Sequence, residues 1–154
     1  MKYDGIIFDM DGTIWNTEKE VCFAWNKVLA DAGHPKRITC DELAGYMGLP
    51  MTEIATRMFG TDDYNSVAEL FGRCMKYENE YIAAHGAALY PDLINTLERI
   101  YRKVPLFIVS NCQSGYIEAF FKAYDTAGYF KDYLCFGDTG ELKDHNIRLL
   151  ARRN

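Results

Sequence analysis

The sequence has few of the residues from which zinc centres and disulfide frameworks are built. It contains only three histidines, and its five cysteines are widely scattered, with no Cys-x-x-Cys pair among them. An odd number of dispersed cysteines and so few histidines disfavour a zinc site. The same pattern predicts reduced thiols and therefore a cytoplasmic protein.

Long apolar runs and an excess of basic residues are also missing. No segment approaches the roughly 20 apolar residues of a membrane span, and the N-terminus lacks the cationic start and apolar run of a signal peptide. The 17 Lys and Arg residues against 22 Asp and Glu give a net charge of −5, so the chain has no global positive field for nucleic acid. We expect neither a membrane nor a nucleic-acid partner. The 49% hydrophobic and 14% aromatic content predicts a packed, globular chain.

The most informative segment is Gly-Ile-Ile-Phe-Asp-Met-Asp-Gly-Thr, residues 5–13. Its apolar residues predict a short buried strand that ends at two carboxylates, Asp9 and Asp11, before a turn at Gly12. Two acids at the end of a buried strand are costly to desolvate without a positive group between them, and Mg²⁺ binds one or two carboxylates together with phosphate oxygens. Asp9 could attack phosphorus while Asp11 transfers protons. An ordinary Asp-rich turn is the alternative interpretation.

Helical patterns fill the next part of the chain. Thr17 and Thr39 are each followed three residues later by Glu, which is the signature of a capping box at a helix start. Amphipathic periodicity and short joins then predict a small all-helical bundle. We therefore expect a helical cap at residues 17–85, inserted into a core that is formed by residues 1–16 and 86–154.

Strands and helices alternate after the insert. An apolar segment at 104–109 ends at Ser110 and Asn111, and a shorter strand is predicted at 133–136. This βα alternation predicts an α/β fold with a doubly wound, parallel, Rossmann-like sheet, whose site lies at the carboxyl ends of the strands. Taken alone, Ser110 could also be a simple helix N-cap.

The D-x-D-G-T sequence after an N-terminal strand resembles the first motif of the haloacid dehalogenase-like hydrolase superfamily. The helical insert is similar to that of its phosphoglycolate phosphatase and β-phosphoglucomutase branch. Ser110 matches the second motif, a Ser or Thr that closes an apolar strand, and Lys143 before a helix matches the third; Lys131 is another possibility. The resemblance implies Mg²⁺-dependent hydrolysis of small phosphate monoesters, such as phosphorylated metabolites, through an aspartyl-phosphate.

The resemblance also implies a role for each matched residue. Asp9 would be the nucleophile and a Mg²⁺ ligand, and Asp11 the general acid/base and a second ligand through its backbone carbonyl. Lys143 would hold the nucleophile and neutralise phosphoryl oxygens, and Thr13 would support the two acids. The expected catalytic residues are Asp9, Asp11, Ser110 and Lys143. The expected substrate-binding residues are Gly12, Thr13, Ser110, Asn111 and Lys143. In the cap, Lys27, His34, Lys36, Arg37 and Arg57 are candidates for substrate recognition by charge alone.

The family's fourth motif, a further strand that ends in one or two Asp residues, is not found before Asn154. Without the C-terminal strands of the core, the strand at 6–8 should be a sheet edge that is open to another chain. We expect a truncated chain with weak or no activity, although a second copy could supply the strand in a homo-oligomer. The alternative function is a non-catalytic phosphate-binding or interaction protein with a decayed site.

Overall fold

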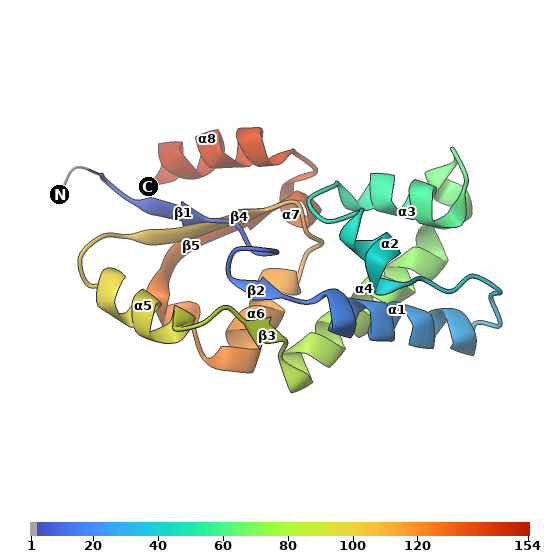
Figure 1. Ribbon diagram of the computed structural model, residues 1–154. Helices are drawn as coiled ribbons and strands as arrows, with labels where there is room; N and C mark the ends of the chain where they lie inside the picture. Colours follow the sequence, from blue (N-terminus) through green and yellow to red (C-terminus); the bar gives the residue numbers. More distant parts are fainter. Residues whose placement is uncertain (1–2) are drawn as a thin grey trace.

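A computed structural model describes residues 3–154 as a parallel sheet with helices on both faces and a helical segment at one end (Figure 1). The sheet contains β1 (Ile6–Phe8), β4 (Leu106–Ser110) and β5 (Phe130–Cys135) in the order β1-β4-β5, with both pairs parallel. All five residues of the central strand β4 are buried, which explains its uninterrupted apolar run. The predicted α/β fold class is therefore confirmed.

Helices cover the two faces of this sheet unequally. Figure 1 shows α8 (Lys143–Arg153) on one face and both α5 (Leu93–Ile100) and α6 (Tyr116–Tyr124) on the other. The buried cluster beneath α8 consists of Phe107, Val109, Leu134 and Leu150. Larger side chains, including Phe120 of α6, fill the main core on the opposite face. This two-sided covering is the doubly wound arrangement that the βα alternation predicts.

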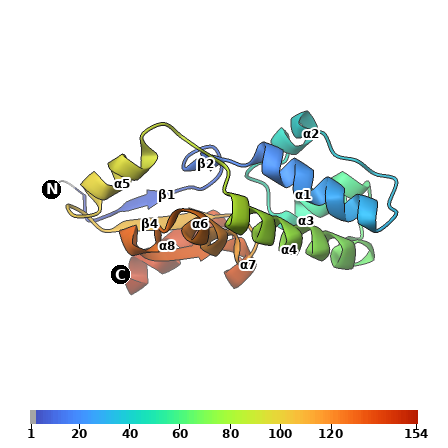
Figure 2. The ribbon, with the colours of Figure 1, turned by 90° about the horizontal axis from the view of Figure 1, so that it is seen from below.

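The helical segment lies beyond the carboxyl ends of the strands (Figure 2). Its elements are α1 (Glu18–Asp31), α2 (Cys40–Ala44), α3 (Met51–Phe59), the 3-10 helix η1 (Tyr64–Ser66) and α4 (Ala68–His85). Helix α4 packs against α1 and also against α6 of the core, with Trp25 of α1 edge-on to Phe71 of α4. Within residues 3–154, no helix has the length and apolar character needed to cross a membrane.

A short antiparallel ladder joins this segment to the rest of the chain. Strand β2 (Trp15–Asn16) pairs with β3 (Ala88–Leu89), so that Trp15 faces Leu89 and Asn16 faces Ala88. The chain therefore enters and leaves the helical segment at neighbouring points. Strands of two residues are too short to produce an alternating pattern, and the sequence did not indicate them. The division into a cap at 17–85 and a core at 1–16 and 86–154 stays a prediction.

The last strand is longer than predicted. Strand β5 begins at Phe130 rather than at Tyr133 and ends before the short helix α7 (Phe136–Thr139), with a further 3-10 helix, η2 (Ala127–Tyr129), ahead of it. Its first half contains the polar residues Lys131 and Asp132, so a hydrophobicity pattern does not identify it as a strand. Asp132 is nevertheless accommodated because Arg153 of α8 donates to its carboxylate, and this guanidinium lowers the pKa of Asp132.

One edge of the sheet is formed by β1, as expected from the absence of a fourth motif. In the described part of the chain β1 pairs only with β4, and Ile7 is 39% exposed. Such an edge presents unpaired backbone groups that another strand can use. The homo-oligomer suggested for this edge stays a prediction.

Candidate active site

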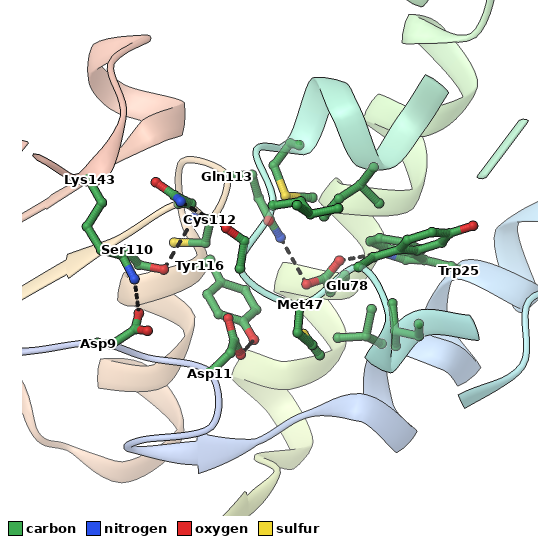
Figure 3. Close-up of a pocket in the computed structure, with 18 residues that line it drawn as sticks. Asp9, Asp11, Trp25, Met47, Glu78, Ser110, Cys112, Gln113, Tyr116 and Lys143 are labelled. Atoms are coloured by element: carbon green, nitrogen blue, oxygen red, sulfur yellow. Dashed lines mark hydrogen bonds and ion pairs between the residues drawn. The ribbon is translucent and has the colours of Figure 1, made fainter. Parts of the chain in front are cut away.

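The predicted site residues meet at the carboxyl ends of β1 and β4, beneath the helical segment (Figure 3). A cavity of about 60 Å³ lies there. Its lining from the core includes Asp9, Asp11, Ser110, Asn111 and Lys143. Its lining from the helical segment is mostly apolar and includes Trp25, Leu43, Met47, Leu49 and Ile54. In a parallel α/β sheet the carboxyl ends of neighbouring strands lie side by side, so residues distant in sequence come together at this edge.

Asp9 and Lys143 form an ion pair at the cavity. Lys143 is the first residue of α8, and its Nζ lies 2.9 Å from Asp9 Oδ1. The same Asp9 oxygen accepts the backbone N–H of Met10 at 2.8 Å, which fixes the carboxylate, while the side chain stays 40% exposed. The alternative lysine, Lys131, instead donates to the backbone carbonyl of Asn154.

Asp11 lies deeper and is held by two hydroxyl groups. Tyr116 Oη donates to Asp11 Oδ1 at 2.6 Å, and Thr17 Oγ1 donates to the same oxygen at 3.1 Å. Burial raises the pKa of Asp11, and these hydrogen bonds oppose that shift because they favour the ionised form. Burial is the larger effect, so Asp11 holds a proton more tightly than an exposed aspartate does.

Thr17 and Tyr116 are site residues that the sequence pattern did not indicate. Thr17 stands at the N-cap of α1 but makes no side-chain cap bond, because its hydroxyl is turned toward Asp11 and Tyr116. The predicted capping box at Thr17 is therefore wrong, whereas Thr39 accepts the Glu42 N–H at 3.1 Å as predicted. For Thr17, the only indication in the sequence was a hydroxyl residue a few positions after the two acids. For Tyr116, the sequence contained no indication of a role in the site.

We expect the Tyr116→Phe variant to be less stable than the native chain by about 1.5 kcal/mol, because a buried carboxyl loses one of its two donors. The pKa of Asp11 should rise further, since a hydrogen bond that favours its ionised form is lost. Urea unfolding at neutral pH measures the stability change. Tyr133→Phe is the matched control, since it removes an exposed hydrogen bond to Glu118 and should change stability by less than about 0.5 kcal/mol. Equal losses in the two variants would contradict the importance assigned to Tyr116.

Ser110 and Asn111 lie where β4 ends. Ser110 is buried, and its Oγ accepts the N–H of Cys112 at 3.3 Å; it is not a helix N-cap, because α6 begins only at Tyr116. Asn111 Nδ2 donates to the carbonyl of Gly48 at 2.9 Å, which ties the loop after β4 to the loop before α3. Asn111 Oδ1 is buried and has no hydrogen-bond partner among residues 3–154.

Gly12 and Thr13, by contrast, are absent from the described lining of the cavity. Gly12 has a φ of +76°, in the left-handed region that glycine adopts readily. A Cβ at this position would meet no atom within 4 Å, so the backbone conformation, rather than a close approach, accounts for the glycine. Thr13 is exposed, and the threonine hydroxyl that donates to Asp11 belongs to Thr17.

The oxygen donors of the site determine whether it can hold Mg²⁺. Among residues 3–154, no three Asp, Glu, His or Cys side chains converge on one point. Asp9 offers an accessible carboxylate, whereas the Asp11 carboxylate is engaged by two hydroxyls. This set fits an ion that binds mainly through water and phosphate oxygens, which is the usual mode of Mg²⁺. Both hydroxyls bond Asp11 Oδ1, so Asp11 could contribute its backbone carbonyl or its other carboxylate oxygen, Oδ2.

A third carboxyl group lines the cavity from the helical segment. Glu78 of α4 is only 3% exposed; it accepts hydrogen bonds from Gln113 Nε2 at 3.0 Å and from Trp25 Nε1 (Figure 3). Burial raises its pKa to about 8, against the hydrogen bonds from Gln113 and Trp25. A signal for Glu78 did exist in the sequence, since it lies four residues from both Cys74 and Ile82 on the buried stripe of α4.

The comparisons with known proteins agree with this fold and these motifs. Residues 6–152 match the sequence model that describes haloacid dehalogenase-like hydrolases. The chain is 24% identical over 148 residues to a phosphoglycolate phosphatase of Aliivibrio fischeri, covering 92% of this chain but 64% of that protein. It therefore spans slightly less than two thirds of the length of this relative.

Two solved structures show the same fold. CbbY from Rhodobacter sphaeroides in complex with phosphate superimposes with a TM-score of 0.81 at 20% identity, over 97% of this chain and 71% of CbbY. A haloacid dehalogenase-like family hydrolase from Streptococcus pneumoniae gives a TM-score of 0.76 at 20% identity, over 97% and 69% of the two chains. Because the family match extends over nearly the whole sequence, the chain belongs to the haloacid dehalogenase-like hydrolase family.

Proposed function

We propose that this chain carries the catalytic site of a Mg²⁺-dependent phosphatase that hydrolyses small phosphate monoesters. The observation that carries the proposal is the Asp9–Lys143 ion pair at the cavity, with the half-buried Asp11 two residues beyond Asp9. Asp9 would attack the phosphorus, form an aspartyl-phosphate and displace the alcohol oxygen of the substrate. Asp11 would protonate that oxygen and then take a proton from the water that hydrolyses the intermediate.

The remaining polar groups would stabilise the transferring phosphoryl group. The transition state of phosphoryl transfer spreads negative charge over the equatorial oxygens, and Lys143 is the cationic side chain that lines the cavity in the described chain. Ser110 Oγ could donate its hydrogen to one of those oxygens. Asp9 and the backbone carbonyl of Asp11 would hold Mg²⁺, which supplies further positive charge against the phosphoryl oxygens.

The size of the cavity supports a short substrate. A cavity of about 60 Å³ suits a small phosphorylated metabolite better than a nucleotide. A phosphatase relative and a fold relative with bound phosphate point to the same class. We further infer that residues 17–85 act as the cap over this site and that the protein is cytoplasmic, which its five free thiols support.

Trapping with beryllium fluoride tests the proposal. In the presence of Mg²⁺, the chain should give a bound ¹⁹F resonance from a fluoride adduct on Asp9, which imitates the aspartyl-phosphate. Asp9→Asn should abolish this resonance, whereas Asp62→Asn, at an exposed aspartate of the loop before η1, should retain it. A chain that binds orthophosphate but gives no adduct would instead be the non-catalytic phosphate binder. An adduct that survives Asp9→Asn would overturn the assignment of the nucleophile.

A further inference from the structure

Glu78 is a buried acid at the cavity for which the proposed reaction has no use. It projects from α4 of the helical segment and lies between the Asp11–Tyr116 pair and Trp25 (Figure 3). The phosphoryl-transfer residues all come from the opposite, core side. Glu78 therefore stands where the leaving group of a bound phosphate ester would extend, and it can contact that group without taking part in the displacement.

The hydrogen bonds of Glu78 leave it with unused acceptor positions. Gln113 donates to Oε1 and Trp25 donates to Oε2, so each oxygen has one donor. A carboxylate oxygen has two lone pairs that can accept. The two bonds hold the carboxyl group in place between α1, α4 and the loop after β4, and the free acceptor positions remain for a ligand.

Because few other charged side chains line the cavity, Glu78 should determine which terminal charge a leaving group can carry. Among the described residues, Lys143 is the cationic side chain in the lining, and it is paired with Asp9 on the core side. The five basic residues considered for substrate recognition are absent from the described lining of the cavity. Three of them form ion pairs elsewhere, Lys27 with Asp31, Lys36 with Glu42 and Arg57 with Glu53. The other two, His34 and Arg37, make hydrogen bonds within their own loop. A carboxylate on the leaving group would thus meet a carboxyl group and apolar side chains, and no cation.

We propose that Glu78 selects for a leaving group that ends in an ammonium group and against one that ends in a carboxylate. The inference rests on the proposed phosphatase function and names its substrate class as short aminoalkyl phosphates. An ammonium has three donors and a positive charge, so it can use the free acceptor positions of Glu78 and stabilise the ionised carboxylate. At neutral pH its binding would release the proton of Glu78 to solvent. A neutral hydroxyl can donate one hydrogen bond but brings no charge.

Three esters of similar length, differing in their terminal group, test this selectivity. Their termini are an ammonium in 2-aminoethyl phosphate, a hydroxyl in 2-hydroxyethyl phosphate and a carboxylate in phosphoglycolate. Binding would be measured by calorimetry at pH 8.5, where Glu78 is ionised, with Mg²⁺ present, in an Asp9→Asn background that prevents turnover. Orthophosphate would serve as the common reference. We expect the Kd to rise in the order ammonium, hydroxyl, carboxylate, with about a tenfold difference between the first and the last.

A second variant separates recognition from a structural role. Adding Glu78→Gln keeps the shape of the side chain, so orthophosphate should bind as before, while the preference for ammonium over carboxylate should fall below about threefold. A purely structural Glu78 would leave the order of the three esters unchanged.

The outcomes distinguish the two proposals. Failure of orthophosphate and all three esters to bind would overturn the proposed function and this inference together. Binding of orthophosphate with equal or reversed affinities for the esters would overturn the inference about Glu78 alone. If the Gln variant does not fold, the order of the three affinities in the Asp9→Asn protein that retains Glu78 still tests the inference.

Discussion

Replacing Gly137 with alanine is expected to destabilise the protein by about 3 kcal/mol and to weaken orthophosphate binding. The backbone of α7 passes directly against the loop after β4. A Cβ at Gly137 would lie 2.6 Å from the carbonyl carbon and 2.8 Å from the Cα of Gln113, and closer still to the nitrogen of Ser114. These are backbone atoms that cannot rotate away, so the loop or the helix must shift.

The displaced loop is the one that connects the site to the helical segment. Gln113 donates to Glu78, Asn111 donates to Gly48, and Gly137 itself donates its N–H to the carbonyl of Cys112 at 3.0 Å. A shift of this loop would therefore disturb the cavity from two sides. The affinity for orthophosphate should fall along with stability, because Ser110 immediately precedes the loop.

Gly128→Ala is the matched control for this prediction. Gly128 also lacks a positive φ, but a Cβ there would meet no atom within 4 Å. Its replacement should change the free energy of unfolding by no more than about 1 kcal/mol. Urea denaturation of both variants measures the difference, and similar values for the two would contradict the close approach at Gly137.

The second large effect is a stabilisation that depends on pH. Glu78 has a pKa of about 8 in the folded protein, raised by burial from an ordinary value of 4.5. As the pH rises from 4.5 to 8, the unfolded chain releases this proton while the folded chain retains it. The contribution of Glu78 to stability is therefore fully present below pH 4.5 and lost as the pH passes 8, by a total of about 5 kcal/mol.

Glu78→Gln removes this loss because an amide does not ionise. We expect the variant to be more stable than the native chain by about 3 kcal/mol at pH 8, but less stable by about 2 kcal/mol near pH 4, where Glu78 is protonated in both the folded and the unfolded chain. The gain at pH 8 is smaller than the total of about 5 kcal/mol because the side chain of glutamine has only one acceptor oxygen. It therefore cannot accept from both Trp25 and Gln113 at the two original positions.

Denaturant titrations of both chains at several pH values between 4 and 8.5 check this prediction. The difference between the two chains isolates Glu78, since all other titrating groups are shared. Glu53→Gln provides the control, because Glu53 is an exposed residue paired with Arg57 and its removal should give a small difference at every pH. A stability difference for Glu78→Gln that does not vary with pH would contradict the raised pKa.

The parts of the fold and site that the sequence predicted follow from short-range patterns and one rule of topology. The apolar run before Asp9 and the run before Ser110 both form parallel strands. Parallel strands end at the same edge, so the meeting of Asp9, Ser110 and Lys143 follows from the order of the elements. The resemblance to a known family then attached chemical roles to positions that the topology had already brought together.

The parts that were not predicted depend on contacts between distant residues. Tyr116 reaches Asp11 across 105 positions of sequence, and no local pattern distinguishes it from another aromatic residue of α6. Thr17 matched a capping box, but a tertiary partner took its hydroxyl. Glu78 is an acidic residue at a position of α4 where the helical pattern predicts an apolar one. Such an exception can indicate a functional site, but a periodicity analysis counts it only as a mismatch.

The pairing of β2 with β3 has a consequence for how such a protein can change. Paired residues of an antiparallel ladder are about 5 Å apart, so Asn16 and Ala88 could be joined by a tight turn in place of everything between them. The helical segment between these strands could therefore be removed, exchanged or altered without a change in the topology of the sheet. Under the proposed function, the groups that select the substrate and the groups that break its bond could then diversify separately.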